Sequence, residues 1–158
     1  MRGVRHEIHR ARLLARLDTA WTAFTDSYAG LPEATLLQPG VAGAWSVRDI
    51  IAHVTWWEAE ALTHLPQILE GRRPPRYSVT YGGIDAFNAL MTERKRSLTL
   101  AAVLREQEET HRRLLDLVLH VPLDQIAGDT RWRRRLRLDT YGHYPKHTAA
   151  IRRWRAGA

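Results

Sequence analysis

Apolar side chains recur three and four positions apart along most of this chain, and strict alternation of apolar and polar residues is scarce. Such spacing places the apolar side chains on one face of an α-helix, because a helix turns once every 3.6 residues. The first segment of this kind spans residues 6–28. Its apolar face consists of Leu14, Leu17, Trp21, Phe24 and Tyr28. Gly30 and Pro32 follow directly, so the first helix should end there.

A second helix is predicted to begin at Ser46. The serine side chain suits a helix N-cap, and Asp49 places a negative charge in the first turn. An apolar stripe continues to Ile68, and Gly71 with the prolines after it should end the helix. Pro66 lies inside the segment, and an interior proline removes one backbone hydrogen bond. A kink or an early end is therefore expected at Pro66.

Two further helical regions follow a loop rich in proline, tyrosine and glycine. Residues 85–97 form one stretch, a break is expected at 98–100 with Thr99 as a new cap, and the pattern then continues to Val121. A final helix is predicted over residues 140–155.

Pro145 is tolerated only in a first helical turn, so this last helix should begin near Gly142 or bend. Four helices with short joints indicate an all-α, four-helix bundle. The length of 158 residues fits a single domain, residues 1–158.

The composition narrows the chemistry that this domain can perform. There is no cysteine, so any metal site must use His, Asp, Glu or water as ligands. No apolar run approaches the ~18 residues that a membrane span needs. The basic N-terminus lacks the apolar core of a secretory signal. These features predict a cytoplasmic protein that does not bind membranes.

The chain carries a net charge of +7, which raises the hypothesis of an anionic or nucleic-acid partner. The basic residues are mostly arginines scattered over several segments, with one dense cluster at 131–137. No helix-turn-helix, RNP or zinc-finger pattern accompanies them. A solvated, arginine-rich surface is the favoured interpretation. Nucleic-acid binding is therefore the least favoured functional hypothesis, behind the two enzyme-like functions described below.

Three histidines are the candidate metal ligands. His143 and His147 are four residues apart, so on a helix they share one face and can bind one ion. Eight histidines produce such a pair by chance in roughly a third of sequences of this length, so a packed or solvent-facing pair is the alternative. His53 lies on the flank of the second helix's apolar stripe. Ligands from two helices that meet in a bundle form a typical metal site, and three ligands leave positions open for water or substrate.

Other residues near these ligands are weaker candidates. Glu60 is the candidate general base, whereas Glu58 is expected on a solvated helix face. Tyr144 is a candidate catalytic residue, and Trp57 and Tyr141 are candidates for the pocket lining. For Trp57, a place in the bundle core is an equally good interpretation. The remaining five histidines are expected at surface or boundary positions: His6, His9, His64, His111 and His120.

Two stretches resemble a known family. Residues 45–58, WSVRDIIAHVTWWE, resemble the signature of DinB/YfiT-like four-helix bundles. Residues 140–147, TYGHYPKH, resemble the GHY-x-x-H end of the ClbS/DfsB branch, as do Phe87, Asn88 and the region 96–104. The resemblance covers nearly the whole chain. Lys146 departs from it, because an acidic residue often stands at this position, and Pro145 and the arginines of 124–139 depart as well.

The resemblance implies an up-down-down-up bundle with a long connection between helices two and three. It implies that His53, His143 and His147 bind a divalent metal, zinc or nickel, and that the protein is a metal-dependent hydrolase or thiol-dependent transferase with a small-molecule substrate. The ClbS/DfsB branch implies self-protection against a reactive, electrophilic metabolite through cyclopropane hydrolysis. Some members of that branch lack the three histidines, so a metal-independent protector is the second hypothesis. Monomer and homodimer both stay open.

Overall fold

The computed structural model describes residues 2–157, without the side chains of residues 2, 3, 5 and 6. The position expected for His6 therefore lies outside the described part. Long helices make up the bundle: α1 (Arg2–Tyr28), α3 (Val47–Leu69), α6 (Leu100–His120) and α8 (Tyr144–Gly157). Shorter helices join or flank them: α2 (Glu33–Leu36), α4 (Tyr77–Thr80), α5 (Ile84–Lys95), η1 (Leu123–Gln125) and α7 (Arg131–Asp139). Within residues 2–157 there is no strand, so the all-α prediction is confirmed.

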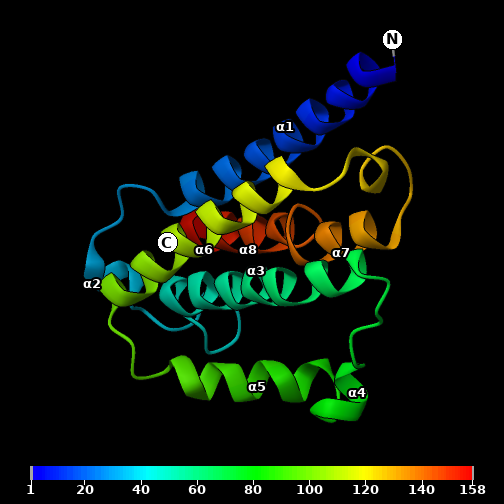
Figure 1. The fold of residues 1–158 in the computed structure, drawn as a ribbon. Coiled ribbons are helices and arrows are strands. Elements are labelled where there is room, and N and C mark those ends of the chain that lie inside the picture. The colour runs from blue at the N-terminus through cyan, green and yellow to red at the C-terminus, as the bar shows by residue number, and fades with distance from the viewer. Residues whose placement is uncertain (1, 158) are drawn as a thin grey trace.

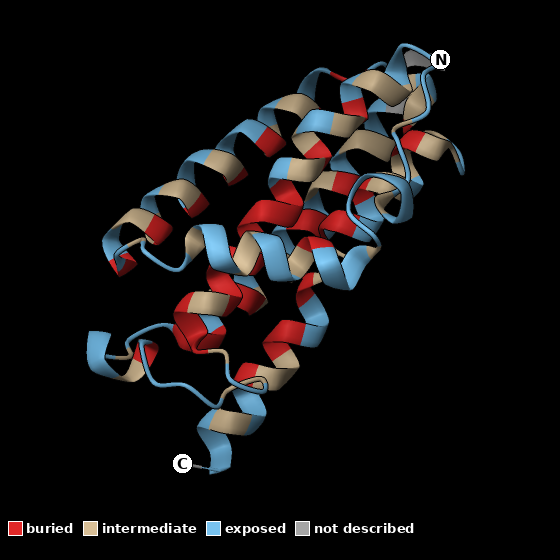
Figure 2. Cartoon of the chain, turned by 90° about the horizontal axis from the view of Figure 1, so that it is seen from below, coloured by how far each residue is buried: buried red, intermediate tan, exposed pale blue. Residues whose placement is uncertain are grey.

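The bundle has the expected topology. Helices α1 and α8 run in one direction, and α3 and α6 run in the other (Figure 1). The parallel pair α3 and α6 requires a long connection, which residues 70–99 provide with α4 and α5. Helix α5 packs against α3, outside the bundle (Figure 1). Buried positions face inward along the four long helices of the bundle (Figure 2), as the hydrophobic periodicity predicts.

Two predicted helix starts are confirmed by side-chain caps. Ser46 Oγ accepts from the backbone N–H of Asp49 at 3.2 Å, and the Asp49 carboxylate accepts from the Ser46 N–H at 3.0 Å, forming a capping box. Thr99 Oγ1 accepts from the Ala102 N–H at 3.1 Å and starts α6. The Arg48 guanidinium donates to the backbone carbonyls of Lys95 and Leu98, which closes the joint between α5 and α6.

The two prolines behave differently from one another. Pro66 does not end α3 early, because the helix continues for its last turn to Leu69. Pro145 is the second residue of α8, where a backbone N–H has no helical partner in any case. The final helix therefore begins at Tyr144 rather than at 140 or 142.

Helix α7 was not expected. Thr130 caps it, with Oγ1 accepting from the Arg133 N–H at 3.1 Å, and Trp132, Leu136 and Asp139 form its buried face. Part of the arginine cluster is therefore structural rather than a solvated surface, because α7 packs against α3. Arg135 in particular donates from Nε to Asp139 at 2.6 Å and from a terminal nitrogen to Tyr77 Oη at 2.6 Å.

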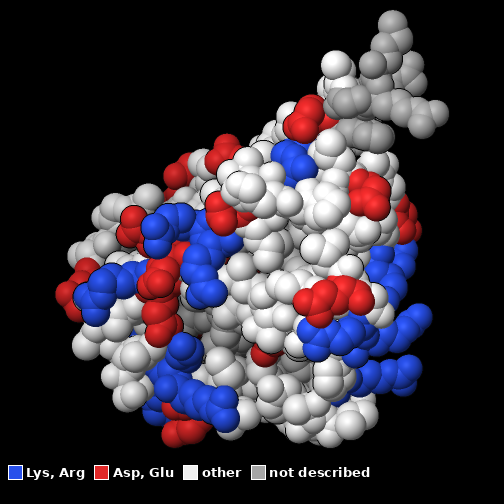
Figure 3. Space-filling model, viewed as in Figure 1, with Lys and Arg blue, Asp and Glu red and all other residues white. Residues whose placement is uncertain are grey.

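The face of the molecule drawn in Figure 3 carries both basic and acidic side chains. The two kinds are interspersed over much of this face. Among the described residues, no helix is long and apolar enough to cross a membrane.

Candidate metal centre

Two helix starts place the three predicted ligands. His53 lies on α3 two turns after the Ser46 cap, where the helix axis is firmly anchored. His143 is the last residue before α8, and His147 lies in its first turn. A tight turn holds His143, because its N–H donates to Thr140 O at 2.7 Å and Gly142 N–H donates to Arg137 O at 2.8 Å. A Cβ on Gly142 would stand 2.7 Å from Arg137 O, so only glycine fits this turn.

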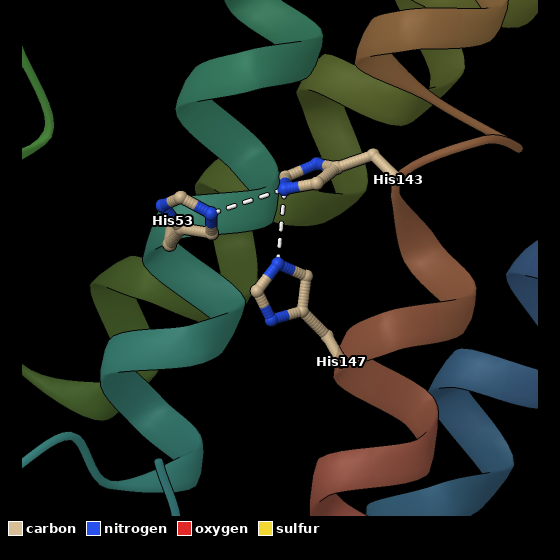
Figure 4. Close-up of side chains that lie close together, drawn as sticks. All are labelled: His53, His143 and His147. Carbon is tan, nitrogen blue, oxygen red and sulfur yellow. Dashed lines mark hydrogen bonds between the residues drawn. The ribbon is translucent and has the colours of Figure 1, made fainter. Parts of the chain in front are cut away.

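The three imidazoles converge on one point (Figure 4). His143 Nε2 lies 3.1 Å from His53 Nε2 and 2.9 Å from His147 Nε2. The ligand atoms of the three residues all lie within 4.8 Å of one another. The structure therefore brings together the metal-ligand set that the sequence predicted.

The ring nitrogens suit a cation better than they suit one another. A neutral imidazole nitrogen offers either one N–H or one lone pair, so His143 Nε2 cannot form two good hydrogen bonds at once. A metal ion between the rings would engage all three Nε2 lone pairs. The donor set of three imidazoles fits zinc or nickel.

Burial keeps these histidines in the neutral form that binds metal. The pKa of His53 is lowered to about 2 by burial, and then by the charges of His147, His143 and Lys146. Burial, followed by His143 and Lys146, lowers the pKa of His147 to about 3. Burial and Lys146 lower the pKa of His143 to about 4. No ligand must therefore lose a proton near neutral pH before binding.

The surroundings of the ligands are mostly aromatic. The ring centroid of Trp45 lies 4.8 Å from that of His53, and Trp56 lies 4.9 Å from it. Trp57 lies 6.2 Å from His143, so this predicted pocket residue does adjoin the site. His53 Nδ1 and His143 Nδ1 are buried and have no hydrogen-bond partner among the described residues. Metal-bound histidines usually donate from this atom to a carboxylate or carbonyl, so the outer support of the site is sparse.

Asn88 on α5 fixes the outer wall of the site. Its Oδ1 accepts from Trp57 Nε1 at 3.0 Å and from Trp56 Nε1 at 3.3 Å. An indole N–H can only donate, so the amide oxygen must face both rings and the amide NH2 is left for the groove that Asn88 lines. Trp45 lines this groove of about 580 Å³ and an adjoining one of about 740 Å³.

Neither groove is lined by one of the three histidines, but both adjoin the site through Trp45, whose ring packs against His53. A further groove of about 770 Å³, which Leu62, Pro66, Leu117 and Trp132 line, shares no residue with the tryptophans around the histidines. The contact between Trp45 and His53 favours the Trp45 side as the approach for a substrate.

The two predicted catalytic residues lie apart from the three histidines. Glu60 is on the same side of α3 as His53, but seven residues span about 10 Å of helix axis. Its carboxylate pairs instead with His64 at 2.8 Å. Tyr144 is turned about 100° from His143 around α8, and its hydroxyl donates to Glu58 in the bundle core. Tyr141 is half-buried beneath the Arg16 guanidinium, which lies 5.8 Å from its ring centroid.

Glu58 and His111 are buried, although the sequence predicts a solvated face for Glu58 and a surface or boundary position for His111. Glu58 is fully buried rather than solvated, and its Oε1 lies 3.0 Å from His111 Nδ1 and accepts from Tyr144 Oη. Trp21 stacks on His111 with ring centroids 3.7 Å apart. A signal was present, because Glu58 lies four residues from Val54 and seven from Ile51 on the buried stripe of α3. His111 likewise lies between Gln107 and Leu114 on the buried stripe of α6.

The family follows from a match over most of the chain. A model of the DinB superfamily matches residues 16–151. The chain belongs to the DinB superfamily. Proteins of this superfamily often bind metal, which agrees with the three converging histidines.

The DinB fold is also seen in a solved structure. The chain is similar to an uncharacterised protein from Escherichia coli UTI89, with a TM-score of 0.79 and 16% sequence identity. The similarity covers 94% of this chain and 93% of that one, and at this identity it supports the fold alone. The comparison with curated proteins finds no match.

Proposed function

We propose that this DinB protein is a metal-dependent enzyme, a hydrolase or a thiol-dependent transferase, that acts on a small reactive metabolite. The observation that carries the proposal is the convergence of His53, His143 and His147 through their Nε2 atoms. Three protein ligands are typical of catalytic sites, because a structural site usually fills all four positions with protein atoms.

The metal would be zinc or nickel, and when bound it would act as a Lewis acid and lower the pKa of a coordinated water. The chain's own residues would prepare the site. Trp45 and Trp56 pack around His53 and exclude water from it. Lys146, exposed beside the ligands, adds positive charge that favours an anionic group on the substrate. The amide NH2 of Asn88 is placed to donate to an acceptor oxygen in the groove.

A second candidate is metal-independent protection of the ClbS/DfsB kind. It is supported by the branch-like residues 140–147 and by Asn88, which holds the tryptophan wall in place. In this function the groove beside Trp45 would sequester or hydrolyse an electrophilic metabolite without a metal. Activity retained in a chelator would favour this candidate, and activity lost in the chelator and restored by zinc or nickel would contradict it.

Metal content, measured by mass spectrometry on untagged protein, tests the first proposal. We expect about one divalent ion per chain. The double variant His143→Ala/His147→Ala should lose it, because only His53 would remain. The matched control His9→Ala/His120→Ala removes two histidines outside the cluster and should keep it. A wild-type chain without metal after incubation with both zinc and nickel would contradict the proposal.

A further inference from the structure

Helix α7 divides the arginine cluster of residues 131–137 into two groups. Arg135 is bound to Asp139 and Tyr77, and Arg131 donates to the backbone carbonyl of Arg72 at 3.0 Å. These two arginines are therefore engaged in holding α7 against its neighbours. The other three, Arg133, Arg134 and Arg137, lie along a different side of α7 and line a groove of about 280 Å³.

A fourth arginine completes this groove from another helix. Arg16 reaches it from α1, and its guanidinium lies 5.8 Å from the ring centroid of Tyr141, which also lines the groove. The turn at Gly128 and Asp129 closes one side. Together with this turn, five side chains form a concave surface, the arginine groove: Arg16, Arg133, Arg134, Arg137 and Tyr141.

The positive charge of the arginine groove is barely compensated by the chain. Asp129 is the one carboxylate in its lining, and it is bound to Arg134 at 3.0 Å. Over residues 2–157, no carboxylate lies within ion-pair distance of Arg16, Arg133 or Arg137. Like charges gathered in a concavity repel one another, and an anion bound between them relieves that repulsion.

Two of the arginines are already held in place by the chain. Arg133 donates to Ile126 O at 3.0 Å, and Arg134 donates to both the backbone carbonyl and the carboxylate of Asp129. The Arg16 guanidinium lies over the ring of Tyr141, which restricts its position. Side chains that are held before binding lose less conformational entropy when they bind, so these contacts favour a ligand site.

We propose that the arginine groove binds a compact phosphate-class anion. Guanidinium groups match phosphate oxygens with paired hydrogen bonds, and the groove supplies four of them. Its volume accommodates an anion of the size of pyrophosphate, and it is small for a complete nucleotide. None of the three histidines contributes to this site, so it is separate from the metal centre and independent of the proposed enzymatic function.

Calorimetric titration of the full-length chain with inorganic pyrophosphate tests the proposal. Pyrophosphate also binds metal ions, so the titration is done with the purified protein and again after removal of metal by a chelator that is then dialysed away. We expect the same saturable binding of one anion per chain in both. Binding that requires the metal would place the anion at the histidines and overturn the proposal.

A pair of double variants assigns the binding to the groove. Arg16→Gln/Arg137→Gln removes two groove guanidiniums and should weaken binding by about tenfold or more, since each removed group makes charge-assisted hydrogen bonds. Arg152→Gln/Arg153→Gln removes the same net charge from exposed positions on α8, outside the groove, and should bind as the wild type does. Circular dichroism would verify that both variants stay folded. Equal weakening in the two variants, or no binding by the wild type, would overturn the proposal.

A nucleic acid offers the same phosphate chemistry in a longer form. A single-stranded oligonucleotide that binds much more tightly than pyrophosphate, with affinity that increases with its length, would indicate a nucleic-acid surface and overturn the compact-anion proposal.

Discussion

Two buried polar clusters lie on α3 and the start of α8, and they are built in opposite ways. In the core, Glu58 accepts from Tyr144 on α8 and lies 3.0 Å from His111 on α6, so one acceptor meets two possible donors. At the flank, His53, His143 and His147 direct three like nitrogens at one point with no carboxylate among them. The side chains of the first cluster form hydrogen bonds with one another. The histidines of the second cluster have no acidic partner in the part of the chain that the structure describes, and their arrangement suits a bound cation.

The difference distinguishes a buried polar cluster that stabilises the fold from one that forms a ligand site. Groups whose donors and acceptors match stabilise the fold, whereas lone pairs that converge without a donor indicate a ligand site. Glu58 Oε2, which has no partner in residues 2–157, is a small exception within the first cluster. The comparison predicts that mutations in the two clusters affect different properties of the protein.

The largest expected effect is on stability, from Glu58→Ala. The variant leaves Tyr144 Oη and His111 Nδ1 buried without their acceptor and also leaves a cavity, so the free energy of unfolding should fall by about 3–5 kcal/mol. Urea unfolding measures this loss. Glu58→Gln, which retains one acceptor oxygen, should lose less. The metal content of the folded variant should stay that of the wild type, and a parallel loss of metal would contradict the separation of the two clusters.

For His53→Ala, the main expected effect is a loss of metal binding. Removal of one of three ligands should weaken zinc binding by about 100-fold or more. In the wild type, free zinc at 100 times its dissociation constant should raise the unfolding free energy by about 2.7 kcal/mol, and in the variant it should add little at the same concentration. Thermal unfolding with and without zinc measures both. Without metal, the variant should lose about 2 kcal/mol, because removal of the buried ring leaves a cavity, and this loss should be smaller than that of Glu58→Ala.

Asp139 is intermediate between the two clusters, because only one of its carboxylate oxygens has a hydrogen-bond partner in the described part of the chain, and its effect on stability should depend on pH. One of its oxygens accepts from Arg135, the other has no partner among the described residues, and burial raises its pKa from 3.8 to about 6. The folded protein therefore holds this proton more tightly than the unfolded chain does. The charged carboxyl lowers stability above pH 6, and this cost is relieved as the pH falls from 6 toward 4.

Asp139→Asn should remove that dependence and keep an acceptor for Arg135. From pH 4 to pH 7, the stability of the wild type relative to the variant should fall by on the order of 2 kcal/mol. Urea unfolding of both proteins at each pH gives the difference, in which the titration of all other groups cancels. A difference that does not change with pH would show that Asp139 titrates normally.

The smallest effect is expected at Asn88, an acceptor matched to two donors at the rim of the metal site. Asn88→Leu removes the partner of Trp56 and Trp57 and should cost about 1–2 kcal/mol. Asn88→Asp retains an acceptor of the same shape and should cost about 0.5 kcal/mol. Urea unfolding and tryptophan emission compare them. Equal losses in both variants would show that the indole hydrogen bonds contribute little.

Local signals made much of the fold predictable. The Ser46 and Thr99 caps are predictable because a capping side chain acts on backbone groups two or three residues away, within one short segment. Helix α7 was missed because its arginines obscure a buried face that consists mainly of Trp132 and Leu136. The metal ligands were predicted from the spacing of His143 and His147 and from the resemblance around His53.

Polar residues in the core were harder to predict. The spacing of Glu58 from Val54 and Ile51 indicates a buried position, but helical spacing within α3 does not reveal its partner, a histidine 53 residues later in the chain. Glu60 was favoured over Glu58 because it shares the side of His53, but a shared side does not bring residues together when two helical turns separate them.

The distance of His53 from its partners along the chain affects how the protein would obtain its metal. His53 and His143 are 90 residues apart, so of the three ligands the unfolded chain holds only His143 and His147 close together. The bundle, in contrast, has two apolar clusters and the Glu58 hydrogen bonds to hold it without an ion. Metal would therefore be acquired after folding, by a site whose shape is already set. Three imidazoles with few outer supports would discriminate weakly between divalent ions, so the supply of ions would influence which one such a site binds.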